Sequence, residues 1–122
     1  MKSRVHILLR APDNKKNKGE MNPAIGRKEC EIEISFQDNR KGFVNVDGLL
    51  CSIRKSRNKI KGDDLVFLEA DLHTGSQEEI NHLRHQGWKF YKASLDHYSL
   101  PHPENPVWIN ETLVHKKKDG AN

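Results

Sequence analysis

Apolar and polar residues alternate along several short stretches of this chain, which is the pattern of β-strands buried on one face only. The clearest alternation covers residues 29–36. One set of side chains should face the core, and it comprises Cys30, Ile32, Ile34 and Phe36. The other set should face solvent, and it comprises Glu29, Glu31, Glu33 and Ser35. We therefore predict a strand with buried apolar residues and exposed glutamates.

Six other segments have the apolar content of strands. They are residues 5–9, 43–46, 49–53, 65–70, 88–95 and 107–114. Between the second and third of these, Asp47-Gly48 is a strong hairpin signal, because both central residues of a type I′ turn have positive φ. In the first segment, we expect Val5, Ile7 and Leu9 to be buried.

One helix is predicted, near residues 76–87. Ser76-Gln77-Glu78-Glu79 has the form of a capping box, and Gly87 suits the left-handed position after a helix. The order of elements predicts an α+β fold, with a mainly antiparallel sheet of about six or seven short strands and the helix on one face. A partly closed barrel is the alternative arrangement.

The length of 122 residues fits a single domain covering residues 1–122, with a long basic loop at about 11–28 and a flexible tail at about 116–122. No apolar stretch is long enough for a membrane helix, and the start of the chain is too short for a signal peptide. The two cysteines, Cys30 and Cys51, lie in strand-like segments and are expected to be reduced. We expect a cytoplasmic protein without a membrane partner.

Lysine and arginine gather in three stretches, at residues 10–28, 54–61 and 116–118. Basic loops on a rigid sheet can meet several phosphates and release their counterions, so the clustering favours a polyanion, nucleic acid or a nucleoprotein first. The expected contact residues are Lys15, Lys16, Lys18, Arg54, Lys55, Arg57, Lys59 and Lys61. Stacking of a base on an aromatic residue is a further possibility, with Trp88, Phe90, Tyr91 and Trp108 as candidates.

Histidine is concentrated in the second half of the chain, at His73, His82, His85, His97, His102 and His115. Three or four converging ligands would be needed for a zinc site, but the chain has no HExxH or paired CxxC spacing. It also has no Gly-rich phosphate loop and no G-x-S-x-G elbow. We expect a binding protein rather than an enzyme, with no metal and no cofactor, although a catalytic role of the histidines stays open.

Two short motifs resemble those of known enzyme families. His97-Tyr98-Ser99 and the upstream His6-Ile7-Leu8 resemble the paired His-x-Ser/Thr signature of the 2H phosphoesterases, although Leu8 stands where the first hydroxyl is required. The order of His97, Asn110 and His115 resembles that of the ββα-metal nucleases, although the last interval is short for the helix of that family. These resemblances imply a histidine-based phosphodiesterase or nuclease.

Three functions therefore follow from the sequence. The first is polyanion binding through the basic loops. The second is an accessory or inhibitor protein, of phage or mobile-element type, that docks on an acidic protein surface. The third is the histidine-based phosphodiesterase. Basic stretches that converge on one face would favour the first function, whereas scattered bases with an exposed apolar patch would favour the second. The oligomeric state does not follow from the sequence.

Overall fold

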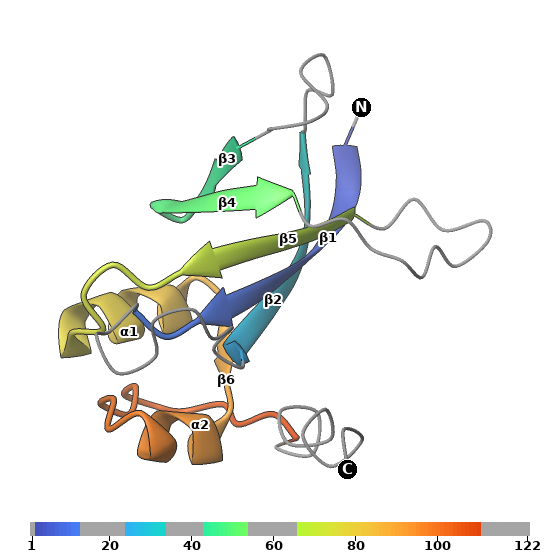
Figure 1. The fold of residues 1–122 in the computed structure, drawn as a ribbon. Coiled ribbons are helices and arrows are strands. Elements are labelled where there is room, and N and C mark those ends of the chain that lie inside the picture. Colours follow the sequence, from blue (N-terminus) through green and yellow to red (C-terminus); the bar gives the residue numbers. More distant parts are fainter. Residues whose placement is uncertain (1, 13–23, 34–42, 54–65, 111–122) are drawn as a thin grey trace, which may run out of the picture.

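A computed structural model describes residues 2–12, 24–33, 43–53 and 66–110. These residues form a mixed α+β fold (Figure 1). The strands are β1 (Lys2–Arg10), β2 (Ala24–Glu33), β3 (Phe43–Val46), β4 (Leu49–Ile53), β5 (Val66–Asp71) and β6 (Lys89–Phe90). The helices are α1 (Gln77–His85) and α2 (Lys92–His97).

The six strands form one sheet in the order β3-β4-β5-β1-β2-β6. Neighbouring strands are antiparallel except β1 and β5, which run parallel. The prediction of a mainly antiparallel sheet is confirmed, and the parallel pair was not predicted. Among the described strands the sheet is open, with β3 and β6 at its two edges, so they do not form the barrel that was the alternative.

The first strand follows the predicted alternation. Val5, Ile7 and Leu9 on β1 are buried, with at most 1% of each residue exposed. In β2, Glu29, Glu31 and Glu33 are exposed as predicted. The apolar residues between them, Cys30 and Ile32, are half-buried rather than fully buried, and Ile34 and Phe36 lie outside the described residues.

The prediction of a loop at 11–28 places the C-terminal end of that loop too late in the sequence. β2 begins at Ala24, so Arg27 and Lys28 belong to a strand. Their neighbours on β1 are Leu8 and Ile7 respectively. The antiparallel ladder with β1 extends β2 back through these basic residues, whose own polarity gives no strand signal.

The hairpin at Asp47-Gly48 is confirmed. β3 and β4 pair from Val46 and Leu49 outward, and the two turn residues have φ values of 54° and 89°. The side-chain Oδ1 of Asn45 accepts a hydrogen bond from the Gly48 N–H at 3.1 Å, which also stabilises the turn.

Helix α1 begins after Ser76, whose hydroxyl accepts a hydrogen bond from the Glu79 N–H at 3.2 Å. The Glu79 carboxylate does not complete the predicted capping box. It accepts instead from the backbone N–H groups of residues 73–75, at 2.8–2.9 Å. Glu79 therefore fixes the loop that leads from β5 into the helix, and Ile80 and Leu83 of α1 point into the core.

The segment 88–95 is not the single strand that its apolar content predicts. Only Lys89–Phe90 pairs with β2, and Lys92–His97 forms α2. Tyr91 donates its backbone N–H to the Ile25 carbonyl at 2.8 Å and then accepts from the Leu95 N–H, which starts the helix. Of the predicted strand at 107–114, the described residues 107–110 form one isolated bridge, between Trp108 and Phe90.

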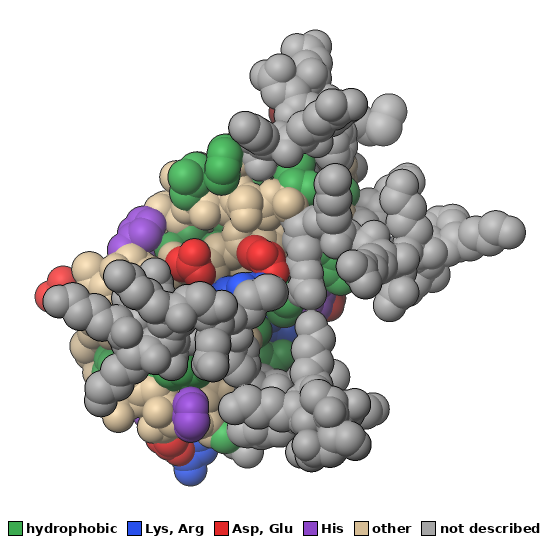
Figure 2. All heavy atoms as spheres, viewed as in Figure 1, with side chains coloured by type: hydrophobic (Ala, Val, Ile, Leu, Met, Phe, Trp, Pro, Cys, Tyr) green, Lys and Arg blue, Asp and Glu red, His purple; other side chains and the backbone are tan. Residues whose placement is uncertain are grey.

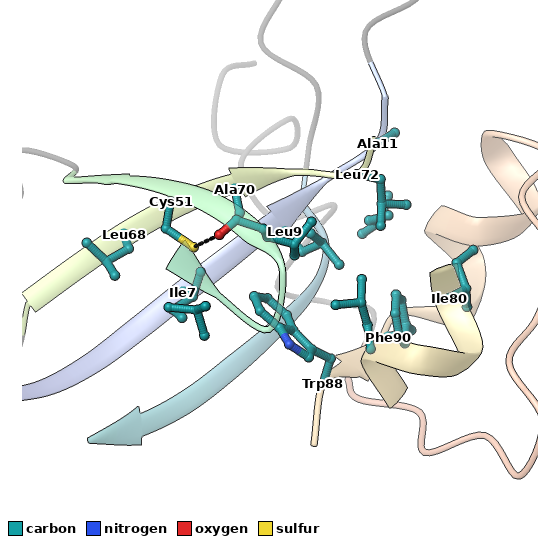
Figure 3. Close-up of a cluster of buried hydrophobic side chains, with 14 of the residues drawn as sticks. Ile7, Leu9, Ala11, Cys51, Leu68, Ala70, Leu72, Ile80, Trp88 and Phe90 are labelled. Atoms are coloured by element: carbon teal, nitrogen blue, oxygen red, sulfur yellow. Dashed lines mark hydrogen bonds between the residues drawn. The ribbon is translucent and has the colours of Figure 1, made fainter. Parts of the chain in front are cut away.

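The core lies between one face of the curved sheet and the two helices (Figures 1 and 3). Trp88 and Phe90 are its largest side chains and are at most 1% exposed. Tyr91 is also buried, so none of these three aromatic residues is available for stacking on a base. Cys51 is buried and Cys30 half-buried, and both are free thiols. Neither helix in the described ranges is long and apolar enough to cross a membrane.

Candidate polyanion interface

All eight predicted contact residues lie outside the described residues, within segments 13–23 and 54–65. They are Lys15, Lys16, Lys18, Arg54, Lys55, Arg57, Lys59 and Lys61. The third basic stretch, at 116–118, lies in the segment 111–122, which is also outside them. The structure does, however, show where each of these segments joins the sheet.

The first and second basic segments join the sheet at opposite ends. β1 ends at Arg10, which is paired with Ala24 of β2, so segment 13–23 leaves and returns at that end. β4 ends at Ile53, which is paired with Leu68 of β5, and Val66 of β5 lies beside Val5. Because β5 runs parallel to β1, segment 54–65 returns at the opposite end, near the start of β1.

The C-terminal segment begins near the first of these two ends. The Ile109 N–H donates to the Phe90 carbonyl at 3.1 Å, and Phe90 pairs with Gly26 of β2. Segment 111–122 starts one residue after Asn110, so two of the three basic stretches join the sheet close to Arg27. We call this end of the sheet, with Arg27 and its neighbour Lys89, the Arg27 end.

Charge is unequally divided between the described residues and the segments outside them. The described residues include eight lysines and arginines and ten aspartates and glutamates, a formal net charge of −2. The remaining residues carry thirteen basic and seven acidic side chains, a net charge of +6. The net positive charge of the protein therefore comes entirely from the segments that join or follow the strands.

Two basic residues from the first stretch are used within the fold. Arg10 forms an ion pair with Glu69 of the neighbouring strand β5. Lys28 Nζ lies 2.7 Å from Asp47 Oδ2, and the same oxygen accepts from Trp88 Nε1 at 2.8 Å. Lys28 and Asp47 are about one-sixth exposed, so this ion pair ties the hairpin turn to β2 and to the core.

Arg27 and Lys89, unlike Arg10 and Lys28, are not used in ion pairs within the described part of the fold. They are direct neighbours across the β2–β6 pair. Burial raises the pKa of the Tyr91 phenol, and the positive charge of Arg27 opposes this, which places Arg27 near that hydroxyl. No pattern in the sequence predicts this basic pair, because the pair depends on which strands become neighbours.

An apolar patch lies on the hairpin at the other edge of the sheet. Phe43 and Leu50 are 61% and 59% exposed. Both lie on the face of the hairpin opposite to the buried Val46 and Cys51, because Phe43 pairs with Ser52 and Asn45 with Leu50. Figure 2 shows hydrophobic side chains over this hairpin and acidic side chains over the neighbouring strand β5.

The described histidines have separate neighbours. His6 contacts Glu29 at 3.0 Å, His73 lies 3.6 Å from Glu79, and His102 Nε2 lies 2.6 Å from Asp96 Oδ1. His82 and His85 are exposed on α1. No group of three or more potential metal ligands occurs among the described residues.

The histidines of the two motifs that resemble phosphodiesterase signatures lie on different elements, one on a strand and the other at the end of a helix. His6 and Leu8 lie on β1, where the His6 ring packs against Phe67. His97 is the last residue of α2 and packs edge-on against Tyr98, and Ser99 follows with a φ of 55°. The last histidine of the nuclease-like order, His115, lies outside the described residues.

The chain matches no known protein family, no curated protein and no solved structure.

Proposed function

We propose that this is a non-enzymatic binding protein that contacts a polyanion, with nucleic acid the first choice, through the basic segments joined to its sheet. The observation that supports this most is the division of charge. A described part with a net charge of −2 does not attract phosphate, whereas the segments outside it carry +6. Arg27 and Lys89 add two cations at the end of the sheet where two of the lysine-rich stretches join it.

The proposal implies a minimum length for the polyanion. The points at which segments 13–23 and 54–65 join the sheet are separated by the length of β5, which has six residues and so spans about 20 Å. Consecutive phosphates of a duplex strand lie about 3.4 Å apart along the axis, so a polyanion must be longer than about six nucleotides to meet both segments. Shorter oligonucleotides reach one end only.

Salt dependence of binding tests the proposal. Replacing Lys15, Lys16 and Lys18 by Gln removes three bases from the segment that joins the sheet at the Arg27 end. Replacing Arg54, Lys55, Arg57 and Lys59 by Gln removes four from the segment that joins the other end. Each phosphate contact on a duplex contributes about 0.9 to the slope of log K against log[salt], so the two variants should lower the slope by about 3 and by 3–4 respectively.

The titrations use duplex and single-stranded oligonucleotides of about 6 and 20 nucleotides, at two or more salt concentrations. The 6-mer should lose slope in only one of the two variants, and the 20-mer in both. A Lys92→Gln variant is the control, because this exposed base lies on α2 and belongs to none of the three basic stretches. Equal slopes for all proteins, or no binding by the wild type near 50 mM salt, would contradict polyanion binding.

A second candidate function is docking on another protein, and two observations favour it. The first two basic segments join the sheet at opposite ends rather than at one, and an apolar patch is exposed. Phe43 and Leu50 form an exposed, uncharged patch on the hairpin. Contiguous exposed apolar residues mark protein interaction sites more often than scattered ones do. If the wild type binds no oligonucleotide, a Phe43→Ser/Leu50→Ser variant becomes the first reagent for testing this function.

A further inference from the structure

We propose that Trp108 is a platform on which one base of a single-stranded nucleic acid stacks. This inference rests on the proposed function and specifies the class of polyanion. It concerns a residue that the polyanion argument above does not use. The support comes from the exposure of Trp108, from the contacts that hold it, and from the chemistry of its surroundings.

The two tryptophans of the chain have opposite environments. Trp88 is 1% exposed and is part of the core, whereas Trp108 is 36% exposed. An exposed tryptophan loses the stabilisation that burial of its large apolar surface would give. Val107 beside it is also exposed, at 42%, so this segment contributes little to the core.

The backbone of Trp108 is nonetheless held on the sheet. The Phe90 N–H donates to the Val107 carbonyl at 3.3 Å, and the Ile109 N–H donates to the Phe90 carbonyl at 3.1 Å. These bonds place residues 107–109 beside β6. Trp108 is thus attached to a strand of the sheet rather than to a free loop.

The indole is oriented by a second set of contacts. The His102 ring packs edge-to-face with Trp108, with ring centroids 5.2 Å apart and an interplanar angle of 76°. His102 is itself held from both helices, because Asp96 of α2 contacts its Nε2 at 2.6 Å and Gln77 of α1 donates to its carbonyl at 2.7 Å. A rigid and exposed aromatic ring is what a stacking platform requires, since little side-chain entropy is then lost on binding.

The chemistry selects an unpaired base. Every nucleobase has a π-face, so stacking on tryptophan tolerates any sequence, and single-strand binders combine such stacking with nearby cations. Lys89 is next to Phe90, the strand residue that forms a bridge with Trp108, so an exposed cation lies on the strand beside this tryptophan. In a duplex the bases are already stacked on one another, so Trp108 should favour single strands.

Affinity for a 12-nucleotide oligothymidylate and for a duplex of the same length, measured for the wild type and for Trp108→Ala, tests this inference. Loss of one base–aromatic stack should weaken single-strand binding by about fivefold to 150-fold, with duplex binding changed less than twofold. Trp108→Phe should keep most of the affinity, because it keeps a ring. Val107→Ala is the matched control and should leave both affinities unchanged.

Tryptophan fluorescence gives a second measurement. In a Trp88→Phe variant, Trp108 is the remaining tryptophan, and oligothymidylate should quench it. If that variant does not fold, the difference between the wild-type and Trp108→Ala titrations gives the same information, because the exposed Trp108 lies outside the core.

The possible outcomes separate the two proposals. Single-strand binding that Trp108→Ala does not weaken overturns the stacking platform and leaves polyanion binding intact. Equal weakening of duplex and single-strand binding overturns it too, because a general change in the fold would explain that result. The absence of any binding by the wild type overturns both proposals.

Discussion

Asp47 is the residue at which the turn, the sheet and the core meet, so its replacement by Asn should measurably destabilise the protein. Asn retains the positive φ that position 47 needs and retains an oxygen that can accept from Trp88. It removes the negative charge that faces Lys28 at 2.7 Å. The substitution therefore isolates the ion pair from the turn.

The magnitude follows from the exposure of the two side chains. Lys28 and Asp47 are 16% and 17% exposed, so water replaces the lost partner only in part. A hydrogen bond to a charged group contributes about 1.5–3 kcal/mol, and breaking a fully buried pair costs about 3–5 kcal/mol. For a pair that keeps some contact with water, we expect the free energy of unfolding to fall by about 2 kcal/mol.

Urea unfolding, followed by circular dichroism and by tryptophan fluorescence, measures this change. Lys28→Met provides the other side of a double-mutant cycle, and the double variant should be more stable than the sum of the two single losses predicts, because no unpaired charge remains. A loss below about 0.5 kcal/mol for Asp47→Asn, or strictly additive effects in the cycle, would refute the view that this ion pair fastens the hairpin to β2.

Three further predictions concern local contacts. Ser76→Ala should lower the free energy of unfolding by about 1 kcal/mol through loss of the hydroxyl that accepts from Glu79, and an unchanged thermal midpoint would contradict this. Burial acts to raise the pKa of the Glu79 carboxyl, but three backbone N–H donors outweigh it and hold the pKa below its ordinary value of 4.5. The ionised Glu79 carboxylate therefore stabilises the fold fully above pH 4.5, and this stabilisation is lost as the pH falls through the lower folded-state pKa. The stability difference between wild type and Glu79→Gln should accordingly shrink on acidification from pH 6 to pH 3. Gly26→Ala should cost more than about 2 kcal/mol, because its Cβ would lie 2.4 Å from the Lys89 carbonyl oxygen, and calorimetry should show a much smaller loss for Gly48→Asn at the open turn.

Local patterns in the sequence predict local structure in this protein. The alternation at Val5, Ile7 and Leu9 matches a buried strand face, and Asp47-Gly48 forms the expected hairpin turn. Ser76 is correctly identified as a residue that caps a backbone N–H. In each case the physical cause, which is side-chain period or turn chemistry, lies within a few residues of the feature.

The errors come from contacts between distant segments. Trp88–Leu95 has the composition of a strand, but the bond from Tyr91 to the Ile25 carbonyl ends β6 and starts α2. The basic residues Arg27 and Lys28 continue β2 because β1 lies beside them. Composition alone cannot show either effect, since each depends on a partner far away in the sequence.

The sequence by itself determined the α+β class, the buried face of β1 and the uneven distribution of charge, because these follow from the order of residue types along the chain. Only the tertiary structure decided that β5 pairs in parallel with β1, and hence that segments 13–23 and 54–65 join opposite ends of the sheet. It also brought Lys28 and Trp88, 19 and 41 residues distant from Asp47, onto one carboxylate. Packing of a shared core favours such pairings, and the entropy lost on closing the intervening loops opposes them. Because both terms depend on the whole chain, no single stretch of sequence predicts the outcome.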